Sequence, residues 1–232
     1  MSRSRGTREI TPDRGEIEMK NAFALALVAA AATAASANVV VNEVVGSTTG
    51  PDVEFIELYN TGASAIDLTG WTIELWDSDS TSFGGADGTA PYALSGTIAA
   101  GGYWTIANGE AASQLGFIGD AFFGNNSIEN SSYTLVLRDA GANVVQTIFF
   151  WDSGAGDQAN IAGSVITPDI TVGPDGTFLP AGFYRAGDGS NNIVIHSFND
   201  FSDYTPGAAN VPAPGALALL GLGGLVAGRR RR

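Results

Sequence analysis

Hydrophobic and polar residues alternate along several short runs in the middle of the chain. In the run 71–76, the odd-numbered residues are Trp, Ile and Leu, whereas the even-numbered residues are Thr, Glu and Trp. This period of two is typical of a half-buried strand, because successive side chains of a strand point to opposite faces. The run 133–138 has the same alternation, and the other runs are rich in β-branched and aromatic residues. The predicted strands are residues 39–45, 54–59, 71–76, 103–107, 133–138 and 144–151.

The segments between these runs carry turn residues instead of a helical period. After residue 37, the only helical pattern is a single turn around residues 110–115. Glycine-rich stretches at 82–88 and 154–163 are predicted to be long loops, either ligand loops or plain surface connections. Many short strands with such turns predict an all-β domain, a β-sandwich. The turn motifs are residues 60–62, 139–141 and 174–176.

The N-terminal segment has the order of a secretory signal peptide. A short basic region and an apolar stretch follow Met19, and the small residues Ala35 and Ala37 form the cleavage site. We therefore predict a signal helix over residues 19–37, removed before Asn38. Residues 1–18 carry eight charges that a signal peptide does not need, so they are either non-native or an extended leader.

The C-terminal segment begins with prolines, continues as an apolar run and ends with arginines. Residues 215–228 contain no charged or polar side chain. As a helix they would reach about 21 Å, less than the roughly 30 Å of a bilayer core, so the hydrophobic helix is a marginal span. The terminal arginines should stay on the cytoplasmic side and leave the upstream chain outside. They are Arg229, Arg230, Arg231 and Arg232.

Charge and composition narrow the function of the part between these ends. The whole chain has a formal charge of −13, but residues 38–210 hold only Arg138 and Arg185 against 20 acidic residues, which gives −18. Such a domain lacks the basic patch that nucleic-acid binding needs. The charge favours solubility and attracts cations. The absence of cysteine excludes thiol catalysis and cysteine-ligated metals.

Few residues offer catalytic chemistry. His196 is the only histidine, so a Ser-His-Asp triad would have to use it, yet no Gly-x-Ser-x-Gly elbow accompanies it. We expect it to be packed or solvated. Glu54 and Glu57 are three apart in a predicted strand, so they project to opposite faces and are expected to be structural. No catalytic residue and no organic cofactor are predicted.

Two features indicate possible binding. Asp77 and Asp79 are two apart beside serines, and together with backbone carbonyls they offer hard oxygen ligands for Ca²⁺; an ordinary acidic loop is the alternative. Asp200 and Asp203 are a weaker pair. Among the tryptophans, Trp76 is the one expected to be exposed, where it could stack on a carbohydrate, although tryptophans in a sandwich are first of all core residues.

The domain resembles the lamin tail domain family. The resemblance rests on residues 41–43, 54–60 and 65–73, and residues 205–210 are similar to the closing motif of that family. It implies an immunoglobulin-like β-sandwich over residues 38–210, with Leu68 packed inward. It implies no active site.

The tail, residues 211–232, resembles the PEP-CTERM sorting signal of bacterial envelope proteins. Val211, Pro212, Pro214 and Gly215 match the motif, whereas Ala213 stands where the motif usually has Glu. The resemblance implies cleavage by an exosortase-like enzyme after transient anchoring in the inner membrane, in addition to processing by signal peptidase. A plain membrane anchor is the alternative.

Together these features predict an exported, non-enzymatic β-sandwich protein of the cell envelope, cell surface or extracellular matrix. Its expected role is adhesion, matrix formation or another envelope interaction with an extracellular polymer or protein. The alternatives are a calcium-assisted glycan- or polymer-binding module and a secreted hydrolase.

Overall fold

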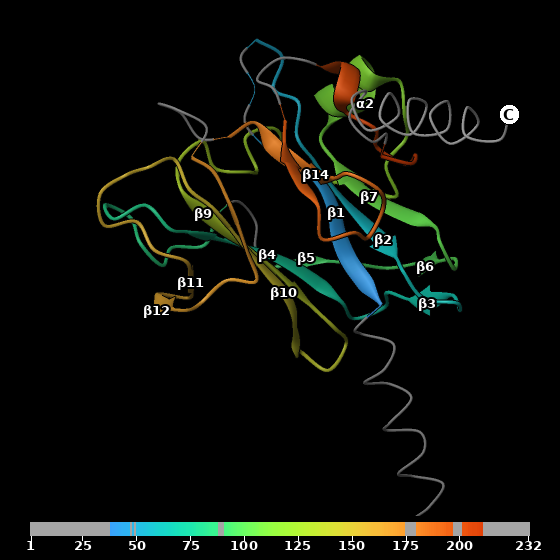
Figure 1. Ribbon diagram of the computed structural model, residues 1–232, viewed down its shortest axis with the longest axis horizontal. Helices are drawn as coiled ribbons and strands as arrows, with labels where there is room; N and C mark the ends of the chain where they lie inside the picture. The colour runs from blue at the N-terminus through green and yellow to red at the C-terminus, as the bar shows by residue number, and fades with distance from the viewer. Residues whose placement is uncertain are drawn as a thin grey trace, which may run out of the picture. The chain divides into compact units, whose positions relative to one another are not determined.

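The computed structural model describes residues 38–46, 48, 50–87, 91–174, 180–196 and 201–210. Two β-sheets enclose one apolar core (Figure 1), so the predicted all-β sandwich is confirmed. Across the six-stranded sheet, the order is β15 (Ile193–Ile195), β14 (Gly182–Arg185), β1 (Val39–Val45), β2 (Phe55–Asn60), β7 (Tyr103–Ala107) and β8 (Ala121–Phe122). The five-stranded sheet contains β13 (Ile170–Val172), β10 (Val144–Phe150), β9 (Tyr133–Arg138), β4 (Thr72–Asp77) and β5 (Tyr92–Ala93).

Smaller elements complete the described fold. β3 (Ile66–Asp67) pairs with β6 (Thr97–Ile98), and β11 (Asn160–Ile161) pairs with β12 (Ser164–Val165). The helix α2 (Gly109–Leu115) follows β7, and a short 3-10 helix η1 (Phe201–Asp203) lies near the end of the described chain. We call residues 201–210 the C-terminal strap. In the described residues, no helix is long and apolar enough to cross a membrane.

The main core forms where the apolar faces of the two sheets meet. On β4, Ile73 and Leu75 are buried, whereas Thr72, Glu74 and Trp76 are only partly buried, as their alternation predicts. Leu68 and Trp71 also point into this core, which agrees with the expectation from the sequence. The burial of these apolar side chains is the main force that holds the sheets together.

Strand β1 contains a bulge that decides which of its side chains reach the outer face of the six-stranded sheet. Val41 pairs with Leu58, but Glu43 pairs with Glu57, so the register shifts between them. An extra residue in one strand shifts the alternation of side chains by one. As a result, both Asn42 and Glu43 lie near Glu57 on the outer face.

Part of the outer face of the six-stranded sheet is covered rather than exposed to solvent. Phe55 of β2 lies there in a second apolar cluster, with Ala111 of α2 and Tyr204 of the strap. The side chain of Asn108 begins α2 by accepting the Ala111 N–H at 2.8 Å, and Gly116 ends it in the left-handed conformation. The helix and the strap therefore cover the part of the sheet around Phe55.

Some details differ from the prediction. The strands predicted at 54–59 and 71–76 begin one residue later, at Phe55 and Thr72. The prediction that β9 is half-buried is wrong, because Thr134 and Val136 on its outer face are fully buried. The glycine-rich stretch 154–163 is not only a loop: it includes β11, whose Asn160 N–H donates to Thr134 Oγ1 at 3.1 Å. This contact helps to cover β9.

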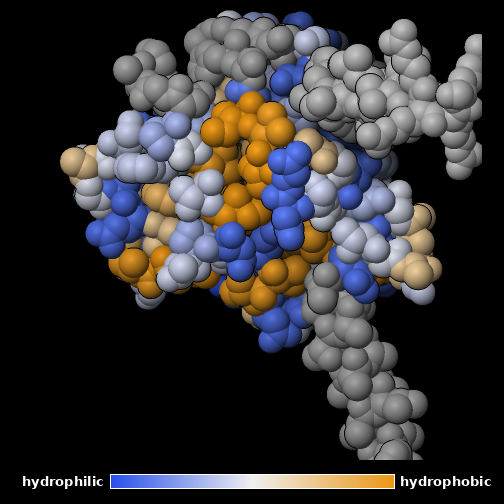
Figure 2. Space-filling view, viewed as in Figure 1, coloured by the Kyte–Doolittle hydropathy of each residue, from blue (hydrophilic) through white to orange (hydrophobic). Residues whose placement is uncertain are grey.

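Apolar side chains also gather on one part of the surface. Figure 2 shows them in the middle of the viewed face, where β14 and β10 lie in Figure 1. The exposed fraction is 37% for Ile195 and 45% for Val144. The strongly acidic domain thus also presents an apolar surface.

The sequence-based assignments at the two ends lie outside the described residues. These are the leader 1–18, the signal peptide 19–37 with its cleavage site at Ala35 and Ala37, and the tail 211–232.

Candidate functional site

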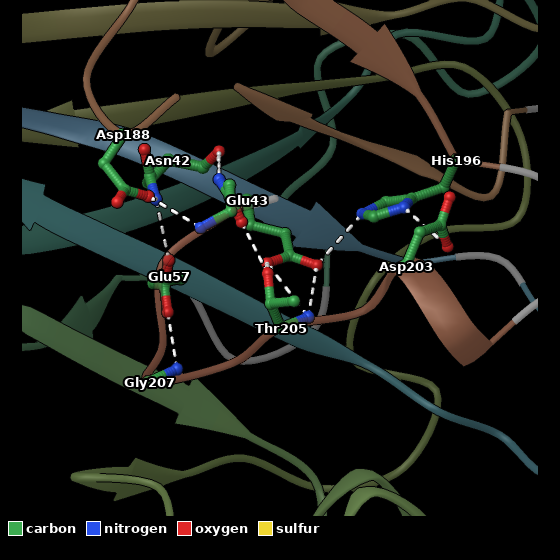
Figure 3. A network of polar contacts seen from close by, with 9 residues as sticks. Asn42, Glu43, Glu57, Asp188, His196, Asp203, Thr205 and Gly207 are labelled. Atoms are coloured by element: carbon green, nitrogen blue, oxygen red, sulfur yellow. Dashed lines mark hydrogen bonds and ion pairs between the residues drawn. The ribbon is translucent and has the colours of Figure 1, made fainter. Parts of the chain in front are cut away.

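A buried polar network lies between the six-stranded sheet and the C-terminal strap (Figure 3). Its carboxyl groups come from four separate parts of the chain: β1, β2, the segment between β14 and β15, and η1. Glu43 and Glu57 are fully buried. Polar groups in such a place must find partners within the protein. The carboxyl-bearing residues are Glu43, Glu57, Asp188 and Asp203.

Three of these carboxyl groups hold the main chain of the strap. Each accepts a hydrogen bond from a different backbone N–H, and Glu43 also accepts one from the Thr205 hydroxyl at 2.9 Å. Hydrogen bonds to carboxylates are stronger than those between neutral groups. The network therefore acts as a binding site for the chain's own C-terminal segment. The N···O distances are 3.1 Å from Thr205 to Glu43, 2.6 Å from Gly207 to Glu57 and 3.0 Å from Asn210 to Asp188.

The residue at the β1 bulge connects the carboxyl groups to one another. Asn42 Nδ2 donates to Glu57 Oε1 at 2.9 Å and to Asp188 Oδ1 at 3.0 Å. Asn42 Oδ1 accepts the Gly189 N–H at 3.0 Å. On the other side, the Tyr103 hydroxyl donates to Asp188 Oδ2 at 2.7 Å. An amide fits this position because it can both donate and accept.

The burial of this network changes its protonation. Burial raises the pKa of Glu57 to about 8, and the nearby charges of Glu43 and Asp188 add to the effect, although the hydrogen bonds from Asn42 and Gly207 oppose it. Removal from water disfavours the charged form of a carboxyl group. The raised pKa favours the protonated form of Glu57 near neutral pH, and in that form the repulsion between the facing residues Glu43 and Glu57 is relieved.

His196 is buried between two carboxyl groups. Its Nε2 lies 3.1 Å from Glu43 Oε1, and its Nδ1 lies 3.4 Å from Asp203 Oδ1. The ring packs against the rings of Tyr184 and Tyr204, with centroids 5.0 Å and 4.6 Å away. The sequence left open whether this histidine is packed or solvated. The structure shows that it is packed.

The arrangement around His196 does not suit a hydrolytic triad. In a triad, one ring nitrogen faces a hydroxyl nucleophile and the other faces a carboxylate. Here both nitrogens face carboxyl groups, and the Thr205 hydroxyl donates to Glu43. This geometry supports attachment of the strap rather than nucleophilic catalysis.

A second buried cluster surrounds Glu54. Its carboxyl oxygens accept the N–H groups of Ser127 at 3.1 Å and Ile128 at 2.9 Å, and Asn108 Nδ2 donates at 3.3 Å. Burial raises the pKa of Glu54 to about 7, partly offset by these hydrogen bonds. Glu54 thus fixes the loop before β9, whereas Glu57 fixes the strap. Glu54 lies one residue before β2, which begins at Phe55, so the predicted geometry within one strand does not relate the two side chains. Both residues have structural partners, as expected.

Asp77 and Asp79 are the predicted calcium ligands: Asp77 ends β4, and Asp79 lies in the turn that follows. Asp77 Oδ1 accepts the Asp79 N–H at 3.0 Å, and Asp79 Oδ1 accepts the Thr81 N–H at 2.7 Å. Asp157 approaches the same turn and accepts the Ser80 N–H at 2.9 Å. Within the described part of the chain, no three His, Cys, Asp or Glu side chains are grouped so as to hold a metal ion. The calcium site stays a prediction.

Trp76, the predicted stacking residue, lies on the outer face of β4. It is partly buried, and its Nε1 donates to Glu74 Oε2 at 3.0 Å. Glu74 also forms an ion pair with Arg138 at 2.9 Å. Trp71 and Trp104 are buried. Trp76 is thus more accessible than these two tryptophans, but it is not fully exposed.

The sequence analysis missed the role of Asn42 and Asp188. One signal was available: a polar pair interrupts the valine run 39–45, which is unexpected for a strand in a core. Asp188 carried no such signal, because it lies in a glycine-rich turn far from Asn42 in the sequence. Only the fold brings them together.

Comparison with known proteins gives the family. The model of the Lamin Tail Domain family matches residues 32–151, which is just over half of the 232 residues. The match includes Asn42, Glu43 and Glu57 but ends before the strap. No curated protein matches the chain. The matched family has an immunoglobulin-like fold and is not typically enzymatic, and the chain belongs to this lamin tail domain family.

Proposed function

We propose that this chain is an exported, surface-sorted and non-enzymatic β-sandwich protein that serves adhesion, matrix formation or another envelope interaction. The observation that carries the proposal is that the buried carboxyl groups bind a segment of the protein itself. Glu43, Glu57 and Asp188 bind the protein's own strap, which supports a scaffold rather than a reaction centre. The family match supports the same class of function.

The two ends of the chain support export of the protein and its sorting to the cell envelope. Residues 19–37 have the order of a signal peptide, and residues 211–232 have the order of a sorting signal with a terminal arginine block. Signal peptidase and an exosortase-like enzyme are the proposed processing partners, with transient anchoring in the inner membrane. The charge of −18 over residues 38–210 fits a well-solvated domain outside the cell. An extracellular polymer or protein is the proposed partner.

Intact mass spectrometry of the cell-envelope fraction tests this proposal. We expect a species that begins at Asn38 and lacks the residues after the region of Pro214. A Pro212→Ala/Pro214→Ala variant should retain the tail, and an Asp67→Asn variant should be processed like the wild type. A cytoplasmic protein that keeps residues 19–37 would contradict export. A C-terminus that stays intact in the wild type would contradict sorting and leave a membrane anchor.

Calcium-assisted polymer binding is the second candidate function. Asp77 and Asp79 lie two apart beside serines, and Asp157 accepts the Ser80 N–H of the same turn, but within the described residues these carboxyl groups do not form a metal-binding cluster. Calcium should then raise the melting temperature of the wild type but not that of an Asp77→Asn/Asp79→Asn variant. Equal melting temperatures of the wild type with calcium and with chelator would contradict the site.

A further inference from the structure

The position of His196 has a consequence beyond adhesion or export. This residue is 1% exposed, and its ring lies between β1 and the strap. Because it is the only histidine of the protein, its charge is the only histidine charge that can change near neutral pH.

We propose that His196 is a pH-operated latch for the C-terminal strap. With its proton, the imidazolium ion joins Glu43 of β1 to Asp203 of η1 and holds the strap on the six-stranded sheet. When the proton leaves, the bridge is lost and the strap is released.

The geometry explains why the proton matters. The two nitrogen–oxygen distances allow ion pairs, but the ring nitrogens and Asp203 Oδ1 are not aligned as hydrogen bonds within the described structure. Attraction between charges tolerates such misalignment, whereas a hydrogen bond weakens steeply with it. A neutral imidazole would therefore leave buried polar atoms without compensation. Only the protonated ring suits this place.

The groups that face His196 are acidic or aromatic. Glu43 approaches from β1, with Glu57 of β2 opposite it, and Tyr184 packs from β14. Asp203 and Tyr204 approach from the strap. The other charged residue of β14 is Arg185, which donates to the main-chain oxygens of Val41 and Ser190. These neighbours favour a positive charge on the ring.

The direction of the pH effect follows from this environment. Burial lowers the pKa of His196, but the contacts with Asp203 and Glu43 outweigh burial, and the net pKa lies above the ordinary 6.5. A histidine with a raised pKa stabilises the closed state fully below its ordinary pKa and loses this contribution as the pH rises through the raised value. The strap is thus closed in mildly acidic solution and loosened in alkaline solution.

Release of the strap would change the surface of the protein. Tyr204 would leave Phe55, with which it makes an edge contact at a centroid distance of 6.3 Å. The outer face of the sheet would then present Phe55 and Val45 next to Glu43 and Glu57. The latch therefore controls access to a surface that is both apolar and acidic.

A titration of the full-length protein tests the proposal, and the single histidine makes it direct. The pH dependence of the His196 imidazole signal in NMR gives its midpoint, which we expect above 6.5. Hydrogen exchange should report the strap through the N–H groups of Thr205, Gly207 and Asn210. After correction for intrinsic exchange, their protection should fall as the pH rises from the open-state pKa of His196 to this midpoint, by about tenfold for each unit that separates the two pKa values.

Three variants separate the contribution of His196 to strap protection from the contributions of other titratable groups. Asp203→Asn should lower the histidine midpoint and shift the loss of strap protection to lower pH, whereas Asp139→Asn in a remote turn should change neither. Glu57→Gln removes the other group that titrates nearby. Because Glu57 also accepts the Gly207 N–H, strap protection in this variant is read at Thr205 and Asn210, where the histidine-linked fall should remain. A wild-type histidine midpoint at or below 6.5, or strap protection that does not change across the midpoint, would overturn the proposal even if a variant fails to fold.

Discussion

At the scale of single residues, the most important feature is a buried carboxyl group that replaces water as the partner of several donors. Glu43 accepts from the backbone and hydroxyl of Thr205 and faces the ring of His196. A buried group with several partners costs more to remove than an exposed one, because each partner loses its hydrogen bond. The contribution of Glu43 to stability should therefore exceed that of any exposed acidic residue.

Glu43→Gln should lower the free energy of unfolding by about 2–4 kcal/mol, since the amide keeps the size of the side chain but removes its charge and one acceptor. Urea denaturation monitored by tryptophan fluorescence measures the change. The matched control is Asp67→Asn, an exposed residue that accepts the Thr69 N–H. It should leave the free energy of unfolding nearly unchanged. Equal effects of the two substitutions would contradict the role given to Glu43.

At the scale of elements, the pairing of β1 with β14 depends on the absence of a side chain at one position. Gly182 pairs with Val45, and a Cβ atom built on Gly182 would lie 1.8 Å from the Val44 carbonyl oxygen. No neighbouring backbone can accept such a contact without moving. Glycine is required here for the close approach of two strands.

Gly182→Ala should therefore separate β14 from β1 and prevent native folding or reduce the melting temperature severely. Gly109→Ala is the control, because a Cβ atom there meets nothing within 4 Å and the residue lies in α2. Alanine in a helix should be neutral or stabilise by up to about 1 kcal/mol. Circular dichroism with thermal melting compares the two. A Gly182→Ala protein as stable as the wild type would refute the strand geometry.

The elements also show what a sequence can predict. The alternation in 71–76 and 133–138 gave strands with correct inner faces, because burial against one core imposes a period of two. The same pattern could not reveal that Thr134 is buried, because its cover comes from Asn160, which lies 26 residues further along the chain. The polar residues within the valine run 39–45 were a signal for Asn42, but the bulge itself was hidden, since it depends on pairing with β2. Local patterns predict strands, whereas the network depends on contacts across the fold.

At the scale of the whole molecule, several buried acids make stability depend on pH in one direction. The pKa values of Glu54 and Glu57 rise from 4.5 to about 7 and about 8 on folding, mainly through burial. Groups with raised pKa values bind protons more tightly in the folded state. Their contribution is therefore complete below pH 4.5 and is lost as the pH rises to about 8. The large negative charge acts in the same direction.

The free energy of unfolding should thus fall steadily between mildly acidic pH and about pH 8, the raised pKa of Glu57. Urea denaturation at a series of pH values measures this slope. In Glu57→Gln the slope should be smaller, because one titrating group is gone, while Asp67→Asn should leave the slope above pH 5 unchanged. Stability that increases with pH over this range would contradict the protonation assigned to the buried acids.

The strap also determines how the domain would respond to mechanical load. A force that pulls on the chain beyond Asn210 reaches the contact with Asp188 first, then that of Gly207 with Glu57, and then that of Thr205 with Glu43. Contacts that break one after another yield at lower force than a strand ladder sheared all at once. In single-molecule stretching, we expect a short extension at low force before the sandwich itself opens; a single large step would contradict this order. The strap would thus take up part of an applied load before the two sheets separate.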